Sequence, residues 1–307
     1  MTHLWTLAGS VLTATLSLST PLIFAADGGV ISERSGVLNI GLEGMTLAGA
    51  FGYFLGGHLA HSAPAAVAAA MIVGALMAVV LTFLNVTLGV DQVIGGLAVN
   101  LMAAGGTAFL YRSAFGLTGS LSVPGIANWH VPGLSRLPLI GPILFQQSPL
   151  TYAALVAVIL TWLFFRHTRP GLWLRATGEH PEAVESAGLS VRGLRTLAVV
   201  ASGLSCGLGG AFLVSQVQNF TENMTAGVGF IALAAVIFGK WDPAGALWAS
   251  LFFGLFQSLQ TALQVTGVRL PYQFLLMVPY VVTIVVLAGF VGQARAPAAD
   301  GKPYRTA

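Results

Sequence analysis

Long apolar runs separated by short polar segments repeat along nearly the whole chain. A hydrocarbon core about 30 Å thick needs about 20 apolar residues in helical conformation to cross it. Runs of suitable length occur at 4–24, 43–60, 64–84, 93–113, 149–165, 194–215, 244–264 and 273–292. The pattern therefore predicts an all-α fold, a polytopic membrane bundle of about eight to nine transmembrane helices that forms one domain over residues 1–292.

Two of the apolar runs need separate treatment. The first, 4–24, is not preceded by Lys or Arg, and Phe24 spoils a small-residue cleavage site, so we interpret it as a retained helix and not as a secretory signal. The run AGVGFIALAAVIFG at 226–239 would reach only about 21 Å as a helix. This second run predicts a re-entrant or broken segment.

Positive charges indicate the orientation of the bundle. The chain has 307 residues, of which 7% are charged, and its formal net charge is +3. Lys and Arg gather in 166–195 and in the tail 293–307, which predicts that both lie in the cytoplasm and that the N-terminus lies outside. The loop 114–148, rich in Gly, Pro and Ser, is then external and ordered, and the protein is expected in the cytoplasmic (inner) cell membrane.

The same composition argues against several classes of function. Basic residues do not form a stripe interleaved with exposed aromatics, which argues against nucleic-acid binding. The single cysteine, Cys206, excludes a disulfide framework. The sequence has no phosphate-binding Gly-rich loop with Lys, no paired-histidine metal helix and no nucleophile elbow. We therefore predict no catalytic residue and no metal site, and expect a partner to supply any chemistry.

The segment GVLNIGLEGM, residues 36–45, interrupts the apolar pattern. At 100° per residue one stripe collects polar side chains and the opposite stripe collects small ones. The polar stripe holds Asn39, Glu43, Thr46 and Ala50, and the small one holds Gly41, Gly44, Ala48 and Gly52. Small residues at this spacing favour close helix packing in membranes.

Glu43 allows two interpretations. A carboxylate at membrane depth normally faces a bundle interior, a water-filled cavity or a partner charge, and Arg34 is the nearest candidate partner in sequence. Alternatively the passage begins at Glu43, and the carboxylate then lies near the cytoplasmic surface in a first turn favoured by the helix dipole.

A second polar and glycine-interrupted segment occurs in the other half of the chain. Residues 36–50 and 226–239 form such a pair, which in transporters indicates a translocation site. QNFTENMTAG, before the second segment, is either a solvated external turn or a polar vestibule whose amides suit uncharged ligands. The candidate residues of a substrate pathway are Asn39, Glu43, Thr46, Asn100, Phe220, Glu222 and Asn223.

Residues 171–192 form the longest internal segment and contain a short predicted helix. Pro181 suits the first helical position, Glu182 and Glu185 lie where the dipole favours anions, and Gly188 supplies the stop. The helix either rests on lipid headgroups or docks into a groove of a cytoplasmic partner. Further on, Asp242 and Pro243 are expected to begin the helix 244–264.

Three segments together resemble one family. They are SERSGVLNIGLEGMTLAGA (32–50), RATGEHPEAVESAGL (175–189) and FTENMTAGVGFIALAAVIFGKWDPAGAL (220–247). They are similar to the permease subunit of ATP-binding-cassette (ABC) importers of the simple-sugar and branched-chain amino-acid class. With DQVIGGLAVNL (91–101), they look most like permeases of nucleoside importers served by a lipoprotein receptor.

The resemblance implies an assembly of several subunits. It implies a substrate-binding lipoprotein outside, a second permease subunit, expected to be a paralogue, and ATPase subunits inside that hold ATP-Mg, with no cofactor on this chain. The coupling helix of the family falls on 178–189, and the ATPase-coupling residues it implies are Gly178, Glu179, Pro181, Glu182, Ala183, Glu185, Ala187 and Gly188.

Other functions stay open at this point. A simple-sugar importer shares much of the pattern. An ion-driven secondary transporter, in which Glu43 binds a proton, would work without an ATPase. A polytopic membrane enzyme would need converging acid, base or metal ligands, whereas the six histidines are scattered along the sequence.

Overall fold

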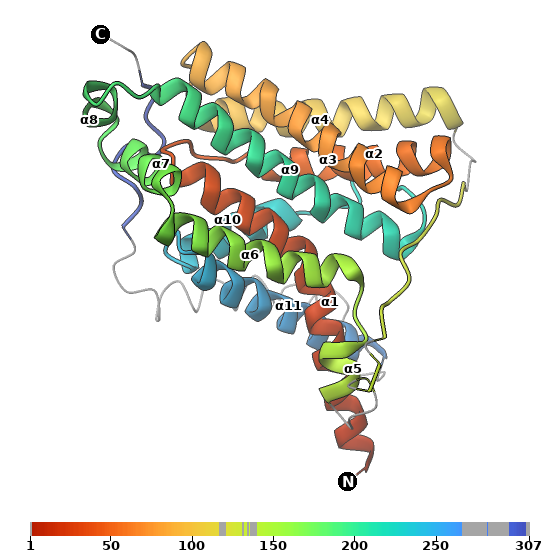
Figure 1. Ribbon diagram of the computed structural model, residues 1–307. Helices are drawn as coiled ribbons and strands as arrows, with labels where there is room; N and C mark the ends of the chain where they lie inside the picture. The colour runs from red at the N-terminus through yellow and green to blue at the C-terminus, as the bar shows by residue number, and fades with distance from the viewer. Residues whose placement is uncertain are drawn as a thin grey trace.

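The computed structural model describes residues 2–116, 121–130, 132–133, 135, 140–265, 281 and 295–304. The described chain is built from helices that lie alongside one another, and the two termini lie at opposite ends of the bundle (Figure 1). The predicted all-α class is confirmed. The predicted helix 273–292 lies outside the described residues.

The helices follow the predicted order, with several differences in their bounds. They are α1 (Thr2–Glu33), α2 (Leu42–Ala60), α3 (Ala63–Thr82) with a π-helical turn η1 (Phe83–Thr87), α4 (Gln92–Phe115), α5 (Ile140–Phe145), α6 (Pro149–His167), α7 (Arg169–Glu179), α8 (Pro181–Ser186), α9 (Val191–Val217), α10 (Val228–Phe238) and α11 (Pro243–Val265).

Six helices of the described chain are long and apolar enough to cross a membrane. They are the spans Gly9–Glu33, Ala63–Thr87, Gln92–Phe115, Pro149–His167, Val191–Val217 and Pro243–Gln264. Helix α2 has 19 residues but carries Glu43 and His58, and α10 is a shorter apolar helix. The total of eight to nine transmembrane helices is thus not confirmed by the described residues.

Helix α1 is longer than the apolar pattern predicted. The prediction ended it at residue 24, before the acidic Asp27, whereas it continues to Glu33. Both acidic side chains are buried, and each accepts a hydrogen bond: Asp27 from the Thr161 hydroxyl at 2.9 Å and Glu33 from the Trp241 indole at 2.6 Å. Buried polar partners therefore allow the helix to extend past its apolar part.

Helices α2, α3 and α9 pack with their backbones nearly in contact. A Cβ on Gly49 would lie 2.5 Å from the Gly207 Cα, and one on Gly74 would lie 2.4 Å from the Gly203 carbonyl oxygen. Membrane helices associate through such small residues because lipid gives little hydrophobic drive for association. Helix α1 packs on α9, α10 and α11 and so completes the interior of the bundle.

The segment predicted as the loop 114–148 contains one element that the sequence did not indicate. Helix α4 runs to Phe115 and the short helix α5 lies within the segment, next to α6. Residues 121–130 are irregular, and the Tyr53 hydroxyl donates to the Pro124 carbonyl at 2.8 Å. Pro142 lies in the first turn of α5, where its missing N–H costs nothing.

Two ends of the bundle are referred to below. The coupling end holds α7, α8, the turn 239–242 and the tail 295–304, and the opposite end holds the α2–α3 turn, the last turn of α4 and the loop 218–227 (Figure 1). At the coupling end, Asp242 accepts a hydrogen bond from the Ala244 N–H at 3.1 Å and Pro243 begins α11, as predicted.

Candidate functional site

The first turns of α2 and α10 meet inside the bundle. A Cβ on Gly229 would lie 2.2 Å from the Glu43 backbone nitrogen, so only a glycine permits this approach. Glycine-interrupted segments of the two halves of the chain are therefore neighbours in space, as the sequence pairing of 36–50 with 226–239 suggested.

The carboxylate of Glu43 caps the start of α10. Its Oε1 accepts hydrogen bonds from the Thr225 hydroxyl at 2.6 Å and from the Gly227 N–H at 2.9 Å, and its Oε2 accepts one from the Gly229 N–H at 2.6 Å. The first N–H groups of a helix have no partner within the helix and carry partial positive charge. Glu43 supplies both the missing acceptors and a compensating charge.

One interpretation of the sequence expected Arg34 to pair with Glu43, and the structure contradicts it. The Arg34 Nε donates to the Trp241 carbonyl at 2.6 Å, and the Trp241 indole in turn donates to Glu33. Arg34 directly follows the end of α1, whereas Glu43 lies in the first turn of α2. Arg34 therefore links the end of α1 to the turn that follows α10, whereas Glu43 binds the start of α10.

Asn100, a predicted pathway residue, caps the start of α2 from helix α4. Its Oδ1 accepts from the Gly44 N–H at 2.7 Å and its Nδ2 donates to the Ile40 carbonyl at 2.9 Å. The first turns of α2 and α10 are thus both capped by side chains of other helices. This arrangement fixes the two helix starts relative to the bundle.

Asn39 lies before the start of α2. The predicted helical stripe that joined Asn39 to Glu43 is therefore wrong. Asn39 is fully buried, and its Nδ2 donates to the Ser202 hydroxyl of α9 at 3.0 Å. Its Oδ1 has no hydrogen-bond partner within the described chain. Thr46 is also buried, and its hydroxyl donates to the Leu42 carbonyl of its own helix at 2.8 Å.

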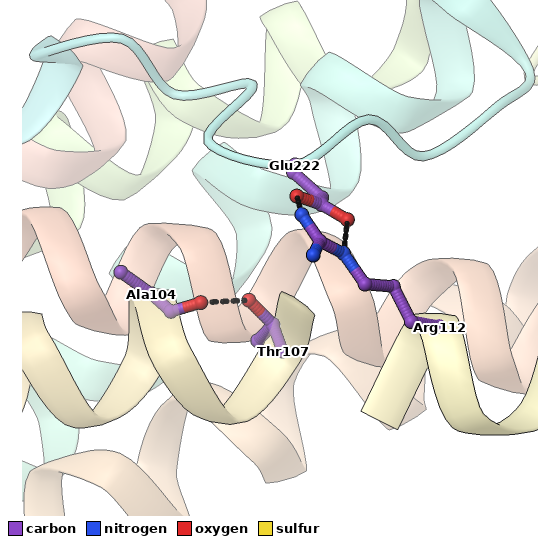
Figure 2. Close-up of polar contacts among 4 residues, drawn as sticks. All are labelled: Ala104, Thr107, Arg112 and Glu222. Carbon is purple, nitrogen blue, oxygen red and sulfur yellow. Dashed lines mark hydrogen bonds and ion pairs between the residues drawn. The ribbon is translucent and has the colours of Figure 1, made fainter. Parts of the chain in front are cut away.

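The remaining predicted pathway residues lie toward the opposite end. Glu222 pairs with Arg112 of α4 through two contacts of 2.5 Å, and the side chains face each other across the gap between loop and helix (Figure 2). Hydrogen bonding to Arg112 holds the pKa of Glu222 below its usual range. Asn223 is exposed, with a positive φ of 56°.

An aromatic cluster, which the sequence reasoning missed, lies beside this ion pair. It comprises Phe51 and Phe54 of α2, Tyr111 and Phe115 of α4, and Phe220 of the loop 218–227. The spacing of three residues on α2 and four on α4 puts each pair on one helical face and was a detectable signal. Phe220, a predicted pathway residue, is 1% exposed within this cluster.

The predicted coupling helix is broken into two helices. The chain turns at His180, with φ of −140° and ψ of 77°, between α7 and the six-residue α8. Gly178 and Glu179 therefore belong to the end of α7, and Pro181 begins α8 as expected. The change of direction follows from Pro181, because the residue before a proline is disfavoured in helical conformation.

Side chains on α8 separate into a buried and an exposed set. Val184, which is not among the predicted coupling residues, is 4% exposed. The predicted coupling residues of α8 and of the turn after it are open to solvent, apart from the half-buried Pro181. The exposed set comprises Glu182, Ala183, Glu185, Ala187 and Gly188. Gly188 has a φ of 78° and ends the helix as predicted.

The tail 295–304 is attached to the coupling segment. The Ala299 N–H donates to the Gly178 carbonyl at 2.8 Å, and the Tyr304 hydroxyl bonds the Glu185 carboxylate. The Lys302 carbonyl accepts from Arg195 of α9 at 3.3 Å. Burial raises the pKa of Asp300, between these attachments, to about 7.

Comparison with known proteins identifies the family. The model of a family described as the branched-chain amino acid transport system / permease component matches residues 11–287. The chain belongs to this permease family. The permease is therefore a multi-pass membrane protein, in agreement with the resemblance found in the sequence.

Three relatives are similar over nearly their whole length. The guanosine ABC transporter permease protein of Bacillus subtilis is 41% identical over 96% of both chains, and the nucleoside ABC transporter permease protein of Lactococcus lactis is 42% identical over 94% of both. A putative glucose ABC transporter permease protein of Haloferax volcanii is 34% identical over 92% of this chain and 91% of its own. A second nucleoside or guanosine permease of each of the two bacteria is 26% identical.

Proposed function

We propose that this permease is the membrane subunit of an ATP-driven importer that carries nucleosides delivered by an external binding lipoprotein. The observation that carries the proposal is the identity of 41–42% to guanosine and nucleoside permeases over nearly the full chain. The subunit holds no ATP itself. ATP with magnesium belongs to a partner ATPase, as in the ABC systems for which these relatives are named.

The orientation in this proposal follows from the positive charges. Of the ten Lys and Arg residues in the described chain, nine lie in the segment that joins α1 to α2, in 166–195, at residue 240 or in the tail 295–304, and these places belong to the coupling end or its surroundings. We therefore place the coupling end in the cytoplasm and the loop 218–227 outside. The N-terminus is then outside and the C-terminus inside.

The α2–α10 contact is the proposed centre of the substrate path. Two helix starts that carry partial positive charge meet here, and Glu43 holds them together through α10. Glu43 and Asn100 cap the two helix starts, so opening the contact between them requires these hydrogen bonds to break. In this proposal Glu43 connects the two helices that line the path. Asn39, whose Oδ1 has no partner within the described chain, is a better candidate than Glu43 for a polar contact with the substrate.

The coupling residues transmit movement of the ATPase in this proposal. Exposed side chains of α8 offer a surface to the ATPase, while the buried Val184 anchors that surface to the bundle. The tail connects α7 and α8 to α9. The backbone of Gly178 in α7 packs against that of Arg34, which in turn bonds the turn before α11. A displacement of α8 therefore reaches both halves of the chain.

Reconstitution tests the proposal. The permease, the second permease and the ATPase are placed in proteoliposomes with the loaded lipoprotein, and uptake of radiolabelled guanosine is measured with ATP, without ATP, and with a hydrolysis-deficient ATPase. We expect uptake only with ATP and active ATPase. Equal uptake in all three conditions would refute an ATP-driven importer and indicate an ion-driven transporter.

A sugar importer is the second candidate, because the Haloferax volcanii relative is named for glucose. The two candidates differ in which solute competes with uptake. Excess unlabelled nucleoside is expected to abolish uptake of labelled guanosine, whereas excess glucose is not. ATP-dependent uptake of glucose with no uptake of nucleoside would decide for the sugar importer.

A further inference from the structure

The aromatic cluster joins α4 to α2 and the loop 218–227, the two elements that also meet at Glu43. The Phe54 ring lies 5.4 Å from Tyr111 and 5.2 Å from Phe115, and the Tyr111 ring lies 5.4 Å from Phe220. These centroid distances are in the range of favourable edge-to-face and tilted contacts. The rings come from α2, α4 and the loop 218–227 and close the space between them.

The position of the cluster relates it to the proposed path. Phe54 lies eleven residues beyond Glu43 on α2, which corresponds to about 16 Å along a helix. The loop follows the same course in the opposite direction, from Phe220 in the cluster to Thr225 and Gly227 at Glu43. The interface between α2 and the loop is therefore closed by rings at one end and by the Glu43 cap at the other.

The loop that carries Phe220 has an unusual backbone. Gln218, Asn223 and Ala226 have φ values of 56°, 56° and 44°, in a region that non-glycine residues rarely adopt. Such conformations persist where surrounding contacts enforce them, and they occur often in segments that switch between arrangements. Here the enforcing contacts are the Arg112–Glu222 ion pair, the Glu43 cap and the hydrogen bond from Val123 to Gln218.

We propose that the aromatic cluster is the outer gate of the path and that its rings stack on the base of the nucleoside when the loop 218–227 moves. The proposal rests on the proposed function, because it names the part of that substrate which is recognised. Every nucleobase presents a π-face on which aromatic side chains stack. A sugar alone lacks this face, so the gate discriminates between the two solute classes.

A purely structural cluster makes a different prediction. Rings that serve only to fill the interior are replaceable by an aliphatic residue with the same effect on every substrate. Rings that touch the base affect purine nucleosides more than pyrimidine nucleosides, since a purine offers the larger stacking area. The comparison of two substrates in one variant therefore separates the two roles.

The test uses Tyr111, which is only partly buried and so tolerates replacement better than Phe54. Turnover of guanosine and of uridine is measured at saturating loaded lipoprotein in the reconstituted complex, for Tyr111→Leu and Tyr111→Phe. Loss of one stacking contact between a base and a ring is expected to lower turnover about tenfold. We expect Tyr111→Leu to slow guanosine about tenfold and uridine about threefold or less, and Tyr111→Phe to stay within about twofold of wild type, since it keeps the ring.

Phe109→Leu is the matched control, because Phe109 lies on the same helix and is 71% exposed, away from the cluster. It is expected to leave both turnovers unchanged. If Tyr111→Leu does not fold, Phe115→Leu replaces it, since Phe115 is also partly buried. Equal slowing of both nucleosides, or none, would overturn the stacking proposal, whereas a wild-type complex that carries no nucleoside would overturn the proposed function instead.

Discussion

Replacing Glu43 with glutamine is expected to loosen the contact between α2 and α10. The amide can accept hydrogen bonds only at its oxygen, and its NH₂ group would face one of the backbone donors that the carboxylate now satisfies. If the oxygen keeps the bonds to Thr225 and Gly227, the N–H of Gly229 loses its acceptor. A bond to a charged group contributes about 2 kcal/mol, and the charge at the helix start adds up to about 1 kcal/mol.

The assay is thermal unfolding of the purified permease in detergent, followed through helical circular dichroism. For a chain of 307 residues, a loss of about 2–3 kcal/mol corresponds to a fall in Tm of about 3–5 °C. Glu222→Gln is the control, because Glu222 is on the same loop but pairs with Arg112 at the protein surface. An exposed ion pair contributes little to stability, so a smaller change in Tm is expected. An unchanged Tm for Glu43→Gln would refute the capping role.

A double-mutant cycle refines this measurement. Thr225→Val removes one donor to the carboxylate and leaves the two backbone donors in place. Because both changes act on one hydrogen-bonded group, their effects should be non-additive by at least about 0.5 kcal/mol. Strict additivity would place the destabilisation of Glu43→Gln elsewhere in the bundle.

Three further predictions concern other parts of the fold. Changing Glu182 and Glu185 to Lys should leave membrane insertion intact but uncouple ATP hydrolysis from uptake; unchanged uptake would argue against α8 as the coupling surface. Burial raises the pKa of Asp300 to about 7 from 3.8, so its protonated form favours the docked tail and docking should weaken as the pH rises from about 4 to about 7. Limited proteolysis of the tail at pH 5 and 8 measures this, and Asp300→Asn should remove the difference. Gly229→Ala should prevent folding, seen as loss of monodisperse protein in gel filtration, because its Cβ would meet the Glu43 nitrogen at 2.2 Å.

The sequence predicted the helical class, the order of the long helices and the pairing of two glycine-interrupted segments. It did not predict the partners of Glu43, because two of the three donors are backbone N–H groups at the start of α10, more than 180 positions later. A backbone donor has no signature in the side-chain pattern. The expected pairing with Arg34 followed from sequence proximity, which does not measure distance in the fold.

The bounds of α1 and of the coupling segment show two further limits. Hydropathy ends α1 before Asp27, because it cannot see that Thr161 will bond this carboxylate in the folded bundle. The start of a helix at Pro181 was predicted correctly from the residues, whereas the coupling helix that the resemblance placed on 178–189 spans the break at His180. Long-range partners were therefore out of reach, whereas this local helix start was not.

The attachment of the tail to α7 and α8 affects how the protein can be handled. A fluorescent or affinity tag joined directly after Tyr304 would sit beside the Glu185 carboxylate and next to the surface proposed for the ATPase. Such a tag would compete with that partner for space and could pull the tail from Gly178. The N-terminus lies at the other end of the bundle (Figure 1), so labels for binding or single-molecule work belong there.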